Sequence, residues 1–382
     1  MAKNFWISLL LALGLFGCST SQNNSKELKL PELVVFELDS LTSNSGNHYE
    51  LYSENDKEVL YVLTPFNNRF VYFDFKTKSK IGEFQVEDDF ENLKIGLAPP
   101  SGFYIHSLDS IFLYDYRKHV LYLWNQNGKA SKVFEFMRNF PNDRSYWSGI
   151  YAESKPYFLD KDLISLGGSV ESQKIIDNQN VDVVLNLKSF EVYRETYLPT
   201  SYLKDHYYSS VRLRPSRAVN KIKNVVYYSY YNSDSIYVRD LSKGNWTSFH
   251  SKVDGMKPFK DISDLTEFHE AESGGVNQLI YNATQGGHFS VFYDEKNNKI
   301  VRVSFLGIQD FDILRHQENP YKFNFVLSFY DPNSFENLGS YQIDQFDYRF
   351  MFFTKNFFYV INPEKNTLED ELVVSKYEYP RF

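Results

Sequence analysis

Residues 110–136 read SIFLYDYRKHVLYLWNQNGKASKVFEF, and their pattern indicates the fold class. An apolar run at 111–114 ends at Asp115, and a polar turn leads to a second run, Val120–Trp124. The sequence NQNG at 125–128 is another turn signal, and a third apolar run follows it. Short runs rich in β-branched and aromatic residues, separated by Asp, Asn and Gly, are typical of antiparallel strands joined by tight turns.

The same order of strand, Asp or Asn, and polar turn recurs along the chain, while long helical periodicity is nearly absent. The closest internal match pairs DSIFLYD at 109–115 with DSIYVRD at 234–240. Such a degenerate repeat of short strands, in units too small to bury their own faces, predicts a β-propeller. Further runs of this form end at Asp74, Asn186, Asp240, Asp294, Asp331 and Asn362.

The predicted fold is therefore all-β, a single β-propeller of six blades, with seven blades as the alternative. At about 58 residues per blade, six blades fit between residue 30 and the end of the chain. Residues 33–38, LVVFEL, are expected to add a strand to the last blade and close the ring, which removes exposed sheet edges. A large β-sandwich or two smaller β-domains is the competing interpretation, although no Pro- or Ser-rich linker divides the chain.

The first residues predict export. After Lys3, residues 5–16 form an apolar core of about 12 residues, too short to span a bilayer, which takes roughly 20. The next residues, Leu15-Phe16-Gly17-Cys18, resemble the bacterial lipobox, with Phe16 bulkier than is usual there. We expect a signal peptide at 1–17, a lipidated flexible tether at 18–29 that is attached through Cys18, and the propeller at 30–382. The alternative is an ordinary secretory signal whose cysteine falls there by chance.

The residues after Cys18 indicate which membrane holds the protein and which side of that membrane it faces. Ser19 stands where an Asp would signal retention in the inner membrane, so the outer membrane is favoured. The first acidic residue is Glu27, and the absence of an acidic cluster nearer Cys18 favours the periplasmic face over the cell surface.

Composition narrows the classes of partner. The formal net charge is −8, and −9 once residues 1–17 are removed, which argues against nucleic acid as a partner. Cys18 is the single cysteine, so no disulfide is expected. Aromatic residues make up 18% of the chain; we interpret most of them as strand packing, with an aromatic platform for sugars as the alternative for a few.

A family resemblance rests on these same motifs. Residues 110–136 resemble a blade of the NHL and TolB-like six-bladed propellers, and residues 294–306 repeat part of that blade. The whole chain, lipobox included, is similar to the propeller lipoproteins common in Bacteroidota. The resemblance implies blades and not a ligand, and it supplies no catalytic residues.

Two segments are candidates for chemistry. Arg212, Arg214 and Arg217 could converge at one opening of the ring and bind carboxylate or sulfate groups. The plainer interpretation is a solvated turn whose arginines pair with carboxylates of this acidic protein. His269 and Glu270, in the acidic segment 261–275, could bind a divalent metal, but no recognised ligand spacing is present and a surface helix or lid is the favoured interpretation.

No recognised catalytic or phosphate-binding motif is present in the sequence. We therefore predict no cofactor, with a divalent metal as the alternative. The predicted function is binding: a module or scaffold, held on the membrane by its lipid, that engages an envelope protein or a glycan. The alternative is a metal-dependent hydrolase, lactonase or lyase hosted by the propeller.

Overall fold

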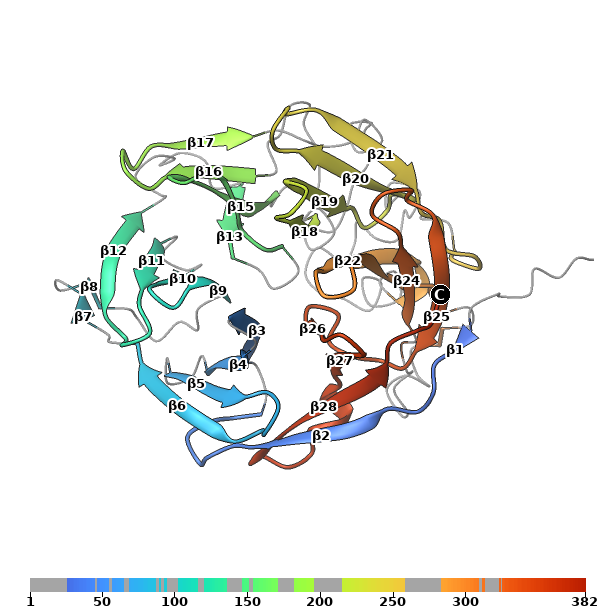
Figure 1. Cartoon of the computed structure of the whole chain (residues 1–382), viewed down its shortest axis with the longest axis horizontal. Helices are drawn as coiled ribbons and strands as arrows, with labels where there is room; N and C mark the ends of the chain where they lie inside the picture. Colours follow the sequence, from blue (N-terminus) through green and yellow to red (C-terminus); the bar gives the residue numbers. More distant parts are fainter. Residues whose placement is uncertain are drawn as a thin grey trace, which may run out of the picture.

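The computed structural model describes most of the chain from Lys26 to Phe382, and the strands form a closed ring (Figure 1). The described residues are 26–44, 47–54, 57–64, 69–86, 89–90, 93–94, 102–115, 120–135, 146–150, 154–170, 182–195, 215–257, 283–308, 311–312, 323 and 325–382.

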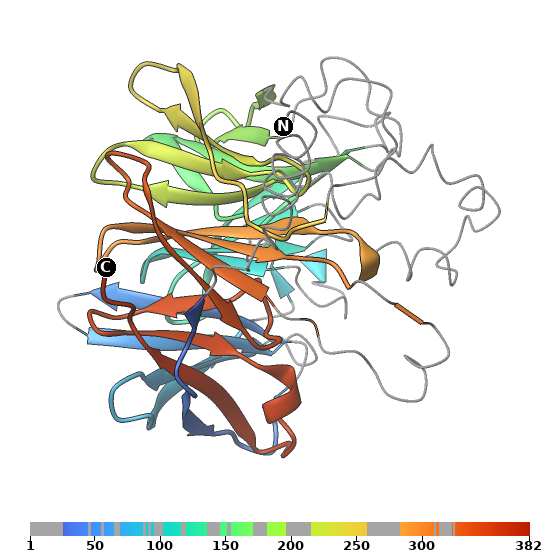
Figure 2. The same ribbon diagram turned by 90° about the vertical axis from the view of Figure 1, so that its right-hand side faces the viewer.

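Six sheets of four or five strands stand around a central axis, so the prediction of an all-β propeller with six blades is confirmed (Figure 1). A separate pair, β7 (Asp89–Phe90) and β8 (Leu93–Lys94), lies outside the blades. In Figure 2 the short turns between β22 and β23 and between β24 and β25 lie at the same end of the ring.

The first three blades follow one another along the chain, each running from the axis outward. In blade 3 the innermost position is divided between two short strands that pair with different halves of the same neighbour. Blade 1 has β3 (His48–Glu54), β4 (Lys57–Thr64), β5 (Arg69–Asp74) and β6 (Lys80–Gln85). Blade 2 has β9 (Gly102–Ser107), β10 (Ser110–Asp115), β11 (Val120–Trp124) and β12 (Ala130–Glu135). Blade 3 has β13 (Tyr146–Gly149) and β14 (Tyr157–Asp160), then β15 (Leu163–Val170), β16 (Asp182–Asn186) and β17 (Val192–Glu195).

The last three blades repeat this plan, with a 3-10 turn, η6 (Pro363–Lys365), between two strands of blade 6. Blade 4 has β18 (Ser216–Asn220), β19 (Val225–Ser229), β20 (Ser235–Asp240) and β21 (Trp246–His250). Blade 5 has β22 (Gly287–Asp294), β23 (Lys299–Phe305), β24 (Phe325–Tyr330) and β25 (Asn337–Ile343), with β1 (Lys26–Glu27) added parallel to β25. Blade 6 has β26 (Met351–Phe353), β27 (Phe357–Ile361), β28 (Glu371–Glu378) and β2 (Glu32–Glu37).

The N-terminal strand closes the ring, as the sequence predicted. β2 pairs antiparallel with β28 and becomes the outermost strand of blade 6, so the first and last parts of the chain share one sheet. Because hydrogen bonds join the two ends of the chain, every blade has a neighbour on each side.

The core lies between the blades and follows from strand alternation. On β4, Leu60 and Val62 point into the cluster shared with blade 6, whereas Tyr61 and Leu63 point into the cluster shared with blade 2. Because successive side chains on a strand face opposite sides, one strand supplies both contacts. Rings such as Phe70 fill these layers; its centroid lies 4.7 Å from Phe84 and 4.9 Å from Phe103, in the range typical of aromatic pairs.

The recurring Asp or Asn forms the turn between the third and fourth strands of blades 1 to 5, and the turn between the second and third strands of blade 6. In blade 1, the Asp74 carboxylate accepts hydrogen bonds from the backbone N–H groups of Lys76 and Thr77, at 3.0 and 2.7 Å. This side-chain cap replaces a backbone acceptor and fixes the turn, which is why Asp and Asn are favoured there. The equivalent residues in blades 2 to 6 are Asn125, Asn186, Asp240, Asp331 and Asn362.

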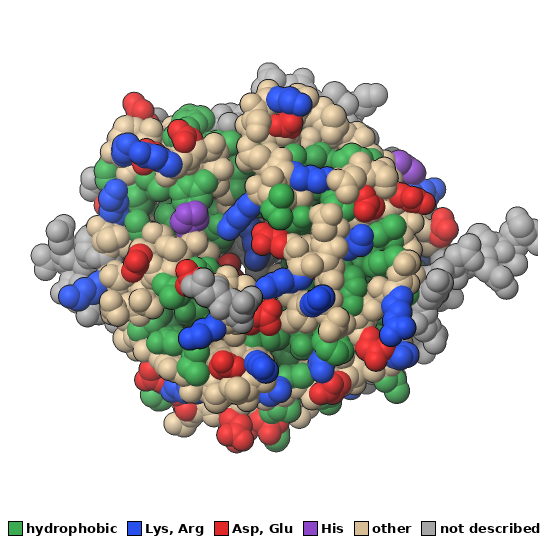
Figure 3. Space-filling model, in the orientation of Figure 1, with side chains coloured by type: hydrophobic (Ala, Val, Ile, Leu, Met, Phe, Trp, Pro, Cys, Tyr) green, Lys and Arg blue, Asp and Glu red, His purple; other side chains and the backbone are tan. Residues whose placement is uncertain are grey.

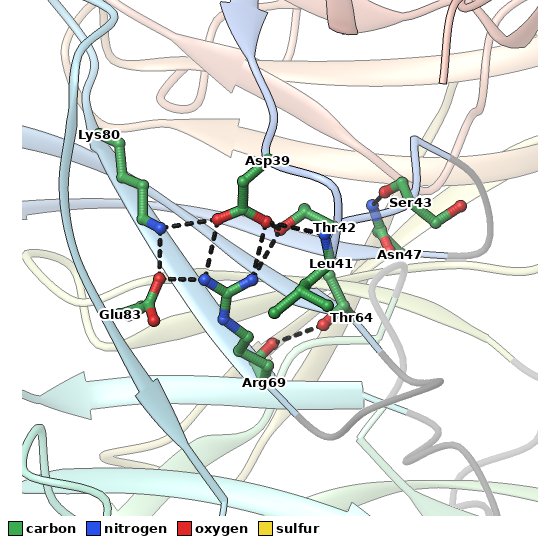
Figure 4. A network of polar contacts seen from close by, with 9 residues as sticks. All are labelled: Asp39, Leu41, Thr42, Ser43, Asn47, Thr64, Arg69, Lys80 and Glu83. Carbon is green, nitrogen blue, oxygen red and sulfur yellow. Dashed lines mark hydrogen bonds and ion pairs between the residues drawn. The ribbon is translucent and has the colours of Figure 1, made fainter. Parts of the chain in front are cut away.

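An ionic cluster, the closure clamp, fastens the end of the closing strand to blade 1 (Figure 4). The Arg69 guanidinium donates to both carboxylate oxygens of Asp39, each at 2.8 Å, and also to Glu83. Lys80 donates to Asp39 at 2.7 Å and to Glu83. Arg69 is nearly buried. Because Arg69 is on β5 and Lys80 is on β6, Asp39, just beyond β2, joins the N-terminal segment to both strands.

Candidate functional site

The innermost strands of the six blades surround the axis, and charged side chains of both signs gather around the central opening (Figure 3). We define the channel cluster as Glu50, His106, Lys155 and Lys221. These residues come from β3, β9, the segment before β14, and the turn after β18. Blade 1 is adjacent to neither blade 3 nor blade 4, so the approach of Lys155 Nζ to Glu50 Oε1, at 3.9 Å, places the cluster at the axis. The charge of Lys221 acts on both Glu50 and His106.

Glu50 is the buried acid of this cluster. Its carboxylate accepts a hydrogen bond from the backbone N–H of Ile105 at 3.1 Å, which joins the innermost strands of blades 1 and 2. Burial raises the pKa of the Glu50 carboxyl, and Lys155, the Ile105 N–H and Lys221 oppose that rise. A desolvated carboxyl with a raised pKa can both donate and accept hydrogen bonds.

Lys155 supplies the nearest positive charge. Its Nζ lies 3.9 Å from Oε1 of Glu50, and about half of the side chain is exposed. The split between β13 and β14 brings this residue to the axis, since the preceding residue, Ser154, forms a parallel bridge with Arg217 of β18. The ammonium group can therefore reach a ligand in the channel while it stays close to Glu50.

His106 of β9 completes the cluster, and Tyr104 of the same strand lies buried beside it. The His106 ring lies 4.3 Å from the Phe158 ring, and burial together with the charge of Lys221 lowers the pKa of His106. Burial raises the pKa of Tyr104, with Glu50 and Glu295 adding to the rise. The arrangement thus offers an imidazole, a carboxyl and two ammonium groups, which suits a ligand with acidic and hydroxyl groups.

Arg217, expected from the sequence as a ligand-binding residue, lies between blades 3 and 4 and is buried. Its guanidinium pairs with Asp182 at 2.9 Å, donates to Ser154 Oγ at 2.9 Å, and lies 5.2 Å from the centre of the Tyr157 ring. Burial alone would lower the pKa of Arg217, but Asp182 raises it above the ordinary value. Its observed partners all belong to the protein, and a ligand-binding role for it stays a prediction.

The Arg217 pair belongs to a larger buried network. Tyr228 donates to Asp182 at 2.7 Å, the Tyr157 and Tyr228 hydroxyls are 2.9 Å apart, and Arg239 donates to Tyr157 at 3.0 Å. Buried charges need such partners, because an unpaired charge at this depth costs several kcal/mol. The network holds blades 3 and 4 in register beside the channel cluster.

A second buried basic group joins blades 4 and 5. Arg302 donates to Ser229 Oγ at 2.9 Å and to the Ser233 carbonyl at 2.6 Å. Close by, His288 Nδ1 lies 2.7 Å from Ser304 Oγ, and its Nε2 lies 3.5 Å from Asp234. Burial, aided by Arg302, lowers the pKa of His288 to about 3. Because Ser304 is fully buried, this Ser-His-Asp grouping does not expose a nucleophile.

The other predicted site residues, Cys18, Arg212, Arg214, His269 and Glu270, lie outside the described residues. Within the part of the chain that the structure describes, no three His, Cys, Asp or Glu side chains are grouped so as to hold a metal ion. No helix in that part is long and apolar enough to cross a membrane.

The sequence reasoning missed Glu50 and Lys155. Glu50 sits in HYELYSE, which reads as an ordinary alternating strand, and nothing local marks β3 as an innermost strand. Lys155 precedes Pro156 in a polar segment that reads as a loop. Only the closed ring brings these two residues together.

Comparison with known proteins identifies the fold family. A family model described as a domain of unknown function (DUF4221) matches residues 25–342. A search of curated proteins finds no match to the sequence. The family match confirms the resemblance to six-bladed propellers of Bacteroidota.

Solved structures agree on the fold. The crystal structure of a DUF4221 family member from Bacteroides vulgatus is 16% identical, covers 94% of this chain and 100% of its own, and gives a TM-score of 0.75. An exported protein from Bacteroides fragilis is 12% identical, covers 94% of this chain and 99% of its own, and gives a TM-score of 0.54. A virginiamycin B lyase from Staphylococcus aureus, at 12% identity, 91% and 99% coverage and a TM-score of 0.44, is too distant to inform function.

Proposed function

We propose that this chain, which belongs to the DUF4221 family, is a lipoprotein of the outer membrane. Its propeller binds an envelope protein or a glycan through the channel cluster. The observation that carries the proposal is Glu50, held buried on the channel wall with Lys155 3.9 Å away and Lys221 acting on the same carboxyl. Perturbed ionisable groups gathered in a concave site are typical of functional sites.

The charges favour a partner that carries acidic and hydroxyl groups. Two ammonium groups attract carboxylate or sulfate, while Glu50 can accept from or donate to a hydroxyl. Acidic oligosaccharides, and protein surfaces rich in Asp and Glu, have this chemistry. Nucleic acid is disfavoured as a partner because the chain has a net charge of −8.

The anchor part of the proposal rests on Cys18 and the lipobox-like LFGC sequence. The Bacteroides fragilis structure is described as an exported protein, which is consistent with a location in the cell envelope. Metabolic labelling with a fatty-acid analogue is expected to mark the wild-type chain but not a Cys18→Ala variant. Equal labelling of both would refute lipidation at Cys18. The periplasmic face is proposed over the cell surface, and protease treatment of intact cells tests it, since a periplasmic chain is protected.

The binding part is tested by thermal shift with acidic and neutral oligosaccharides and peptidoglycan fragments. A ligand at 100 times its dissociation constant adds about 2.7 kcal/mol to the free energy of unfolding. We expect an acidic ligand to stabilise the wild type and to lose this effect in Lys155→Gln. The matched control is Lys188→Gln, which alters an exposed lysine in a turn of blade 3. Equal stabilisation of both variants would contradict a site at the channel cluster.

A metal-dependent hydrolase, lactonase or lyase is the second candidate. The observation in its favour is that burial raises the pKa of Glu50, because general acids in enzymes are often carboxyls whose pKa is raised in this way. The test adds divalent metals and a chelator to the same screen. Stabilisation by a metal that the chelator abolishes would favour the enzyme over the binding module.

A further inference from the structure

The closing strand carries apolar side chains on the outside of the ring. Leu30 is 93% exposed, Leu33 50% and Val35 38%, and we call these three residues the rim patch. The patch lies on β2 and just before it, at the outer edge of blade 6 (Figure 1).

Strand alternation explains why these side chains face outward. Val34 and Phe36 are buried in the core between blades 6 and 1, so Leu33 and Val35 project from the opposite face of the same strand. A strand with one buried face normally carries polar residues on its other face. Here two of the three outward positions, Leu33 and Val35, are apolar and the third is Glu37. Adjacent exposed apolar positions are typical of a surface that meets another apolar medium.

The position of the patch along the chain indicates which medium this is. Seven residues, 19–25, separate the lipidated Cys18 from β1, and β1 is fixed to β25 at the outer edge of blade 5. The eight steps along the chain from Cys18 to Lys26 span at most about 29 Å when extended, so the membrane lies within that distance of the rim. Leu30 follows only three residues after Glu27.

Charges beside the patch are largely paired. Lys29 bonds to Glu378 at 2.7 Å, and Lys376 bonds to Glu32 at 2.8 Å. Ion pairs cancel the local charge, so attraction to anionic headgroups is weak and apolar contact is favoured.

We propose that the rim patch rests on the lipid surface of the membrane that holds the anchor. This inference depends on the lipid anchor in the proposed function. Contact along the rim turns the ring on its edge, with the channel axis nearly parallel to the membrane. Both openings of the channel then face the aqueous compartment, which leaves the channel cluster accessible to a large partner.

The test uses the lipidated chain purified from cells and reconstituted in vesicles of phosphatidylethanolamine and phosphatidylglycerol. Acylation blocks the Cys18 thiol, so a Leu33→Cys variant takes up a thiol-reactive, environment-sensitive fluorophore at one place. Lys188→Cys, in the turn of blade 3 across the ring, is the matched control. Melting temperatures of both labelled variants are compared with that of the wild type to show that each is folded.

We expect the fluorophore at Leu33 to shift to shorter wavelength on vesicles and to lose most of its emission to brominated lipid. The control is expected to change in neither respect, because contact depth at an interface is only about 5–10 Å. Vesicle-bound protein whose Leu33 probe behaves like the control refutes the rim proposal alone. A blue shift without vesicles that grows with protein concentration also refutes it, in favour of a second copy of the chain. A wild type that labels at Cys18 and does not float with vesicles refutes the anchor, and the rim proposal with it.

Discussion

Replacing Asp39 with alanine removes the centre of the closure clamp, and we expect the ring to lose stability. Asp39 accepts two hydrogen bonds from Arg69 and one from Lys80, at 2.7 to 2.8 Å. It is the residue through which the N-terminal segment, after β2, is fastened to blade 1 (Figure 4). The variant leaves the apolar core of β2 intact, so the loss reports the ion pairs of Asp39 together with the hydrogen bonds that it accepts from Leu41 and Thr42.

The magnitude follows from the burial of the two partners. Breaking a buried ion pair by removing one member costs about 3–5 kcal/mol, because the other charge stays buried. The Arg69 side chain is only 7% exposed, but that of Asp39 is 32% exposed, and Glu83 still pairs with Arg69. Solvent screening and the remaining partner reduce the expected loss to about 2 kcal/mol.

Urea unfolding of the lipid-free chain, followed by fluorescence, measures the loss. With an m-value of about 3 kcal/mol per molar, a loss of 2 kcal/mol lowers the midpoint by about 0.7 M. Lys80→Ala is the control, since it removes one bond to Asp39 and leaves both bonds from Arg69 in place, so it is expected to cost less. If Asp39→Ala unfolds at the same midpoint as the wild type, the clamp does not stabilise closure.

Three further predictions concern buried ionisable groups. Arg217→Leu leaves Asp182 buried without its 2.9 Å partner, and we expect the free energy of unfolding, measured in urea, to fall by about 3–5 kcal/mol. Adding Asp182→Asn should recover most of this loss. An equal loss in the double variant would contradict the pairing. His288 has a pKa of about 3 in the folded chain against 6.5 in the unfolded one. Between these two pH values the unfolded chain binds a proton that the folded chain does not. The free energy of unfolding therefore falls as the pH drops from 6.5 towards 3, and this residue contributes about 1.4 kcal/mol per pH unit. A His288→Gln variant should show a shallower pH dependence in this window, and an unchanged slope would count against a neutral His288. Glu50→Gln keeps an oxygen that can accept from the Ile105 N–H, so we expect stability to be retained while binding at the channel cluster weakens; a folded variant with undiminished ligand affinity would exclude Glu50 from the site.

The fold followed from the sequence because its determinants are local. Short apolar runs and the Asp or Asn after each one are visible without any tertiary information, and Asp74 and Asp240 cap their turns as that pattern implies. Closure by residues 33–38 was predictable as well, because a propeller needs a strand from one end of the chain to complete the ring.

The uneven intervals of the repeat have a structural cause. A blade contains more than one strand–turn–strand unit, and these look alike in sequence. Asp115 ends β10, a second strand, and Asp294 ends β22, a first strand, whereas Asp240 ends a third strand. The closest internal match therefore pairs a second strand of blade 2 with a third strand of blade 4.

The candidate site could not be read from the sequence, because its residues come from different blades. Arg217 was chosen from a cluster of arginines, but strand β18 turns its side chain into the interface with blade 3. Glu50 and Lys155 are 105 positions apart and carry no motif. Their proximity depends on the ring closing and on the break between β13 and β14, and neither their burial nor their pairing is a local property.

Isothermal titration calorimetry, with the acidic oligosaccharide that stabilises the wild type most, shows whether the channel cluster binds this ligand. It compares the wild type, Lys155→Gln and Lys188→Gln. A ligand held by the channel cluster should bind the wild type and Lys188→Gln with the same affinity, and Lys155→Gln about tenfold more weakly, since losing one hydrogen bond to a charged group costs about 1.5 kcal/mol. Equal affinity for all three proteins, or no binding of any acidic oligosaccharide or acidic peptide to the wild type, would contradict a binding site at the channel cluster.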